Sequence, residues 1–185
     1  MKLLKNRKFA ILITVLIVCT ATLIGMGVSL DRSARAIEAM FFDGVYLDDE
    51  GFTQPGISSH LANRQSSALS FATIMEGYPE LAAETEALLV ARRALIDASS
   101  FPEKHSANEA MQEAFTELVE RARNLELAGR DRDDMERFSM SFYGAQTAID
   151  NSRYNQKAAA FMDNASFFAH FLRPVLFVTP PQTFS

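Results

Sequence analysis

The chain has 185 residues, a formal net charge of −5 and a single cysteine, Cys19. Four of its 18 lysine and arginine residues lie in the first eight positions, so the rest of the chain carries 14 basic and 23 acidic residues, a net charge of −9. An acidic body repels phosphate backbones, which disfavours nucleic-acid binding, and one cysteine excludes an intrachain disulfide framework.

The N-terminus has the pattern of a membrane anchor. A basic flank, residues 1–8, precedes an uncharged apolar run, residues 9–28, which is long enough to cross a bilayer core as a helix. Positive charge before the run predicts a cytoplasmic N-terminus and a body on the other side. A cleaved signal peptide is the alternative, because Ala34-Arg35-Ala36 has the form of a cleavage site. We favour an uncleaved single-pass anchor, since signal peptides have shorter apolar regions.

Three segments follow: a juxtamembrane helix and turn-rich linker (29–56), a helical body (57–165) and an apolar tail (166–185). In the body, apolar residues recur at intervals of three and four, and no segment alternates with the period of a strand. The stripes are Ile57, Leu61, Ala68, Phe71, Met75 and Tyr78; Leu81, Leu88, Ala91 and Leu95; Met111, Phe115, Leu118, Ala122 and Leu125; and Met135, Phe138, Phe142, Ala145 and Ile149. Arg64 interrupts the first stripe. The predicted fold is all-α: an antiparallel, coiled-coil-like bundle of three or four long helices after a single N-terminal transmembrane helix.

Local signals predict where the helices begin and end. Gly77-Tyr78-Pro79 is expected to kink a continuous helix, because no linker surrounds Pro79. Ser106, followed by Glu109, has capping-box spacing and should begin the next helix. Gly129 should end that helix in the left-handed conformation.

The tail is strongly apolar over residues 167–178, but that stretch is too short to span a bilayer. It either docks on the bundle, lies in the membrane interface or binds a partner. We favour docking on the bundle, because exposed apolar patches of this kind are rare on soluble surfaces.

The sequence contains no glycine-rich phosphate loop, nucleophile elbow or paired-cysteine metal site. Its three histidines, His60, His105 and His170, are far apart in sequence and lack a metal-binding spacing. The aspartates around Asp131 lack the glycine and distal glutamate of a calcium loop, and Glu84 with Arg92 has the spacing of a solvated helix face. We therefore assign no catalytic, cofactor-binding or metal-binding residue, and expect a protein that is not an enzyme.

The body resembles the LemA family of bacterial membrane-anchored helical proteins, as a divergent member. Residues 60–95 and 117–127 are similar to the first two core helices of that family, and Arg153-Tyr154-Asn155 looks like its arginine-tyrosine-asparagine signature. One heptad on, where the family usually repeats tyrosine-asparagine, this chain has Phe161-Met162. The resemblance implies a helical bundle beside the bacterial inner membrane, and it brings no agreed enzymatic activity.

The signature residues Arg153, Tyr154 and Asn155 are the candidate partner-binding site. A helix-borne asparagine in an apolar stripe either makes an interhelix hydrogen bond that fixes register or contacts a partner protein. Our leading hypothesis is a membrane-anchored, non-enzymatic scaffold or adaptor with an unknown protein partner. The alternative is a membrane-tethered sensor that binds a small molecule or peptide between helices, near Tyr78, Arg92 and Tyr154.

Self-association is a further prediction for the anchor. Gly25 and Gly27 are small enough to let two membrane helices approach closely, so a homo-oligomer remains open.

Overall fold

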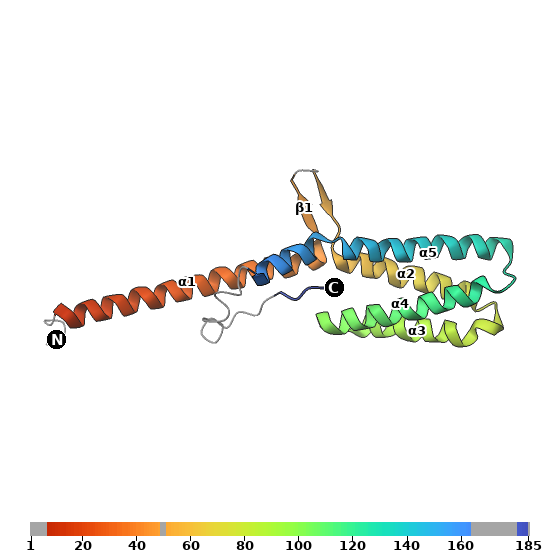
Figure 1. The fold of residues 1–185 in the computed structure, drawn as a ribbon, viewed down its shortest axis with the longest axis horizontal. Helices are drawn as coiled ribbons and strands as arrows, with labels where there is room; N and C mark the ends of the chain where they lie inside the picture. The colour runs from red at the N-terminus through yellow and green to blue at the C-terminus, as the bar shows by residue number, and fades with distance from the viewer. Residues whose placement is uncertain (1–6, 49–50, 164–180, 185) are drawn as a thin grey trace. The chain divides into compact units, whose positions relative to one another are not determined.

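The computed structural model describes residues 7–48, 51–163 and 181–184. It is mostly helical, with a long apolar N-terminal helix, a two-stranded hairpin and then four packed helices (Figure 1). This confirms the predicted fold class. The elements are α1 (Arg7–Asp43), β1 (Val45–Leu47), β2 (Phe52–Gln54), α2 (Ile57–Met75), the 3-10 turn η2 (Pro79–Leu81), α3 (Ala82–Asp97), α4 (Phe101–Arg123) and α5 (Gly129–Asp150). Residues 153–163 are also helical.

The chain divides into two compact units, which are described separately. One contains Met1–Ala39 and Lys157–Pro181, and the other contains Met40–Gln156 and Gln182–Ser185. We call the second the bundle unit. The hairpin and helices α2 to α5 all belong to it.

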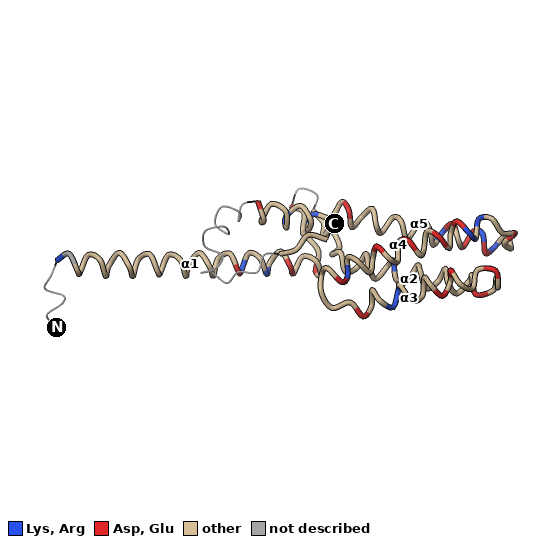
Figure 2. Tube along the Cα trace, turned by 60° about the horizontal axis from the view of Figure 1, so that its bottom comes forward, with Lys and Arg blue, Asp and Glu red and all other residues tan. Residues whose placement is uncertain are grey.

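Helix α1 is uninterrupted over 37 residues, so the predicted juxtamembrane helix is its continuation. From Phe9 to Leu30 it carries no charged side chain (Figure 2). Among the described residues it is the one helix long and apolar enough to cross a membrane. This is consistent with either a single-pass anchor or a signal sequence.

In the bundle unit, α2 packs against α3 and α5, and α3 packs against α4 (Figure 1). The core is aromatic at its centre: Phe115 and Phe142 stack with ring centroids 3.8 Å apart, and Phe71 lies 5.1 Å from Phe115. Burying each such ring contributes about 2–3 kcal/mol. The predicted stripes are confirmed, since all their residues are buried apart from four half-buried ones, Tyr78, Ala91, Leu125 and Phe138.

Pro79 separates two helices, so the prediction of one kinked helix is wrong. Helix α2 ends at Met75, and Pro79 begins the 3-10 turn that leads into α3. The physical reason is the residue before the proline. Tyr78 has extended backbone angles, φ −121° and ψ 96°, because the proline ring disfavours the helical conformation at the preceding position.

Helix α4 begins earlier than predicted, at Phe101 rather than near Ser106. A second serine, Ser100, forms the capping box: its hydroxyl accepts from the amide of Glu103, whose carboxylate accepts from the Ser100 amide at 3.1 Å. A proline in the first turn favours the same start. Gly129 was predicted to end α4, but it begins α5.

The capping box makes a prediction about pH. Hydrogen bonds from the Ser99 and Ser100 amides and the Ser99 hydroxyl lower the pKa of Glu103 to about 2, from an ordinary value of 4.5. Its contribution to stability is therefore complete above about pH 4.5 and is lost as the pH falls towards 2. Melting the full-length protein in detergent should show that Glu103→Gln loses less stability than the parent between pH 5 and pH 2.5. Glu117→Gln, an exposed change on the same helix, is the control, and a Glu103→Gln curve parallel to the parent would contradict the prediction.

The hairpin lies inside the segment predicted as a linker. Strands β1 and β2 pair antiparallel, with Leu47 opposite Phe52, and the Gly51 amide closes the turn on the Leu47 carbonyl at 2.8 Å. Three-residue strands are too short to show an alternating pattern, which is why the sequence does not reveal them.

Two glycines allow the close approach of chain segments at the base of the hairpin. Gly44 has φ +87°, and a Cβ there would lie 2.2 Å from the carbonyl oxygen of Gln54. At Gly56, which precedes α2, a Cβ would lie 2.5 Å from the carbonyl oxygen of Phe41. Both positions therefore require glycine.

Candidate functional site

The least expected feature of the bundle unit is a fully buried arginine. Arg64 lies on the inward face of α2, between Leu61 and Ala68, and none of its surface is exposed. Its guanidinium carbon lies 4.0 Å from the centroid of the Phe142 ring. The residue that interrupts the apolar stripe therefore stays inside the core.

Three neutral amide side chains surround this charge. One terminal nitrogen of Arg64 donates to the side-chain oxygens of Asn108 and Gln146, and the other donates to that of Gln112. Among the described residues, Arg64 Nε has no hydrogen-bond partner. Burial lowers the pKa of Arg64 to about 10, while the nearby Asp150 opposes this shift, so the guanidinium remains charged at neutral pH. We call these four residues, Arg64 and its three amide partners, the arginine cage.

Further hydrogen bonds hold the amides in place. Gln146 donates to the Asp150 carboxylate at 2.7 Å and accepts from Asn108 at 3.1 Å. Gln112 donates to the Thr116 hydroxyl at 3.3 Å. These contacts orient the amide oxygens towards Arg64 and link its charge to Asp150 through one side chain.

The amides of the cage also line a cleft of about 550 Å³, which we call the α4–α5 cleft. Its lining residues are His105, Asn108, Glu109, Gln112 and Glu113 of α4, Gln146 and Asp150 at the end of α5, and Phe184. Three of these described residues carry carboxylates and none is a lysine or arginine. The cleft is therefore acidic and is large enough for a small ligand or part of a peptide.

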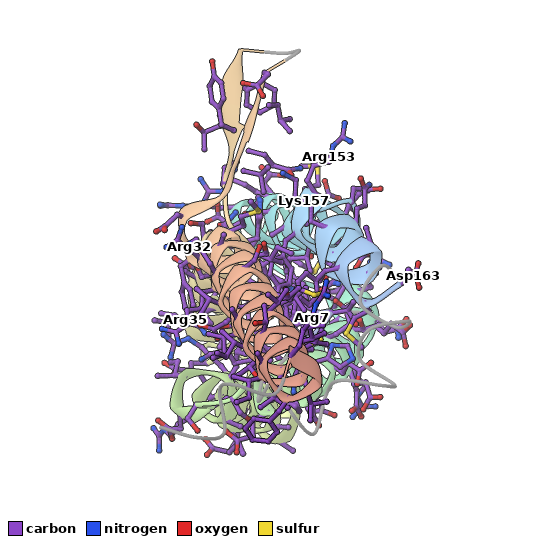
Figure 3. The ribbon with its side chains drawn as sticks, turned by 90° about the vertical axis from the view of Figure 1, so that its left-hand side faces the viewer. Arg7, Arg32, Arg35, Arg153, Lys157 and Asp163 are labelled. Carbon is purple, nitrogen blue, oxygen red and sulfur yellow. The ribbon has the colours of Figure 1, made fainter. Side chains whose placement is uncertain are left out.

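Next to this cleft lies the predicted signature. Ser152 is buried after the end of α5, and its hydroxyl accepts from the amide of Tyr154, as in a helix N-cap. Tyr154 is fully buried, with ring centroids 5.6 Å from Phe41 and 6.2 Å from Phe101. Arg153 is exposed and its side chain points outwards (Figure 3).

The signature binds the C-terminal end of the chain. The Tyr154 hydroxyl donates to the carbonyl of Gln182 at 2.7 Å. The Asn155 amide accepts from the Phe184 N–H at 2.8 Å and donates to the Phe184 carbonyl at 3.2 Å. The asparagine therefore finds its partners in the C-terminal segment, and neither of the two predicted roles, register or partner contact, anticipated this.

The Phe184 ring fills an aromatic pocket. It is 2% exposed, with centroids 5.5 Å from both Phe41 and His105. We call Phe41, His105, Tyr154 and Asn155 the C-terminal clamp. The tail stretch predicted to dock, residues 167–178, lies outside the described residues.

The residues proposed for a sensor site do not come together. The Tyr78 hydroxyl donates to Asp131 at 2.6 Å, in the first turn of α5, whereas Tyr154 follows the last turn of that helix. The hydrogen bond to Asp131 raises the pKa of Tyr78. Arg92 donates to the backbone carbonyl of Gln65 at 2.9 Å. None of these three residues lines the α4–α5 cleft, and of the three only Tyr154 lies next to it, through the segment that contains Phe184.

The other polar candidates have separate partners. Glu84 pairs with Arg121 of α4 at 2.9 Å rather than with Arg92. The Nε2 atom of His105 lies 3.5 Å from the Oε1 atom of Glu109. In the described ranges no three metal-ligating side chains cluster, and His170 lies outside them.

Together these features define the class of the molecule: an apolar N-terminal helix followed by a bundle of four helices, with a caged arginine in its core and a clamp for its C-terminal segment. No protein-family model, curated protein or solved structure matches the chain. The resemblance to the LemA family and the partner-binding role of Arg153, Tyr154 and Asn155 stay predictions.

Proposed function

We propose that the protein is a membrane-anchored, non-enzymatic adaptor, a divergent LemA-like protein whose bundle unit binds another envelope protein. The apolar helix and its basic flank support a single-pass anchor in a bacterial inner membrane, with the N-terminus in the cytoplasm. The bundle unit would then be displayed on the non-cytoplasmic side.

The observation that carries the adaptor proposal is a set of three exposed aromatic side chains on and just before the hairpin. Tyr46 and Phe52 on the hairpin and Phe42 before it are 60%, 48% and 56% exposed. The backbone amide of Arg153 donates to the Gln54 side chain at 3.0 Å, which joins the signature to the hairpin. Exposed aromatic residues and arginine are the side chains that protein interfaces favour.

Tyr46 and Phe52 lie on opposite faces of the hairpin, because Phe52 pairs with Leu47 whereas Tyr46 pairs with Thr53. We call Phe42, Tyr46, Phe52 and Arg153, which are exposed on both sides of the hairpin and at its base, the hairpin surface. Figure 3 shows the hairpin projecting and Arg153 pointing outwards. Of the three signature residues, Arg153 alone is exposed, so it is the one whose side chain is available to a partner in this conformation.

Crosslinking in cells tests this proposal with the full-length protein. We expect one reproducible partner in the membrane fraction, identified by mass spectrometry and lost in both Tyr46→Ser/Phe52→Ser and Arg153→Ala. The double variant Val90→Ser/Ile96→Ser makes a similar change at exposed apolar positions of α3 and should keep the partner. The free energy of unfolding of all three variants should lie within about 0.5 kcal/mol of the parent's, because they alter exposed side chains. Self-crosslinks alone would overturn the adaptor, and a partner retained by both hairpin-surface variants would overturn the hairpin surface as its contact.

A further inference from the structure

The C-terminal clamp recognises its segment in the way that proteins recognise extended peptides. A side-chain amide carries the same donor and acceptor as a backbone peptide group. Asn155 uses both on one residue, because its oxygen accepts from the Phe184 N–H and its nitrogen donates to the Phe184 carbonyl. This is the pattern of a strand pairing with a neighbouring strand.

Two further contacts give the clamp a register and a side-chain preference. Tyr154 binds the carbonyl of Gln182, two residues before Phe184, and so fixes how far the segment extends. The pocket beside Phe41 and His105 encloses the phenylalanine ring, which is 2% exposed. Since the hydrogen bonds all reach backbone atoms, the phenylalanine is the one side chain that these contacts select.

The segment is docked on the bundle unit without being its direct continuation. Residues Lys157–Pro181 belong to the other compact unit, whereas Gln182–Ser185 belong to the bundle unit. The clamp therefore contacts a short stretch of four residues that belongs to the bundle unit separately from Met40–Gln156.

We propose that the C-terminal clamp is a peptide-binding site for an extended segment bearing phenylalanine, and that the C-terminal segment of a second copy of the chain can replace the resident one. This inference is independent of the adaptor proposal, because it involves the clamp and not the hairpin surface. It gives the sensor alternative a ligand of defined chemistry: three backbone groups, on two residues that are two positions apart, and one aromatic ring.

A photoreactive peptide tests the site directly. The probe has the sequence of residues 181–185 with a photoreactive phenylalanine in place of Phe184, and the protein is the full-length Phe184→Ala variant in detergent. We expect crosslinks that map near Phe41, His105 and Tyr154, and that fall at least fivefold when millimolar unlabelled peptide competes. A competitor with alanine at the position of Phe184 should not compete. The parent protein should crosslink at least fivefold less, because its own segment fills the clamp.

Two controls keep the result interpretable. A chain ending at Pro181 removes the resident segment altogether and should behave as Phe184→Ala does, which guards against misfolding caused by one substitution. Combining Phe184→Ala with Asn155→Leu should abolish the crosslink. Equal crosslinking of parent and variants, crosslinks elsewhere, or crosslinks that resist competition would overturn the proposal.

Exchange between copies is tested by mixing two differently tagged full-length variants. Phe184→Ala keeps an intact clamp, and Asn155→Leu keeps an intact segment. We expect them to co-purify after mild crosslinking when mixed, whereas pairing each variant with itself should give at least fivefold less product. If the mixture gives no more product than the self-pairings, the second copy is not the occupant.

Discussion

Replacing Arg64 by alanine should lower the free energy of unfolding of the full-length protein by about 3–5 kcal/mol. The substitution deletes a buried side chain that packs on Phe142 and leaves the amide oxygens of Asn108 and Gln112 without a donor, whereas that of Gln146 keeps its bond from Asn108. Each buried acceptor left unpaired costs about 1–3 kcal/mol, although Gln112 is half-buried and recovers part of this by turning to water.

Urea titration in detergent, followed by circular dichroism, measures this change. Arg93→Ala, the same substitution at an exposed position of α3, should shift stability by less than about 0.5 kcal/mol. Replacing three of the four cage residues, with Arg64→Met, Asn108→Leu and Gln146→Leu together, should recover much of the loss, because the fully buried polar groups are removed and the half-buried Gln112 keeps its bond to Thr116. An Arg64→Ala variant as stable as Arg93→Ala would show that the cage does not stabilise the bundle.

The second large effect is expected at Tyr154, where Tyr154→Ala should cost about 3–5 kcal/mol. The ring is fully buried against Phe41 and Phe101, so its removal leaves a cavity in the clamp. Tyr154→Phe keeps the ring and removes the hydroxyl that binds the Gln182 carbonyl, so it should cost only about 1 kcal/mol.

The same denaturation assay distinguishes two roles for Tyr154, packing in the core and contact with a partner protein. Tyr46→Ala removes an equivalent ring that is 60% exposed and should leave stability nearly unchanged. A Tyr154→Ala variant that melts like the parent but loses its crosslinked partner would contradict the structural role, and would assign the residue to partner binding instead.

The helical core could be predicted because packing imposes its period on the sequence. Met111, Phe115 and Leu118 repeat at intervals of four and three, and all are buried in the bundle. The ends of the helices were harder to predict from the sequence. Ser100 and Ser106 both have a glutamate three residues later, so the sequence contains two capping-box patterns, and Pro102 in the first turn after Ser100 distinguishes them.

The sequence indicated the position of Arg64 in the core, but it did not indicate which side chains would bind it. Arg64 was visible as a charge in an apolar stripe, and Asn108 and Gln112 follow one another at helical spacing beside the Met111 stripe. Its partners, however, lie 44, 48 and 82 residues away along the chain. Which inward polar groups meet depends on helix register, and side-chain periodicity within single helices does not encode that register.

The C-terminal clamp was harder still to predict from the sequence, because the residue that Asn155 binds, Phe184, lies 29 residues further along the chain. The signature drew attention to Tyr154 and Asn155 through family resemblance, and the sequence indicated that the asparagine needs a partner. Nothing in the local pattern around Phe184 distinguishes a docked segment from a free end, since recognition uses its backbone and one common aromatic side chain.

The two glycines at the base of the hairpin bear on how this protein would change over evolutionary time. Apolar stripes tolerate exchange among leucine, methionine and isoleucine, so the amino acids at these positions can change while the bundle fold is kept. No such freedom exists at Gly44 and Gly56, where any side chain would collide with backbone. Distant descendants of the same ancestor should therefore share a sparse fingerprint, two glycines separated by eleven residues, just before the first helix of the bundle.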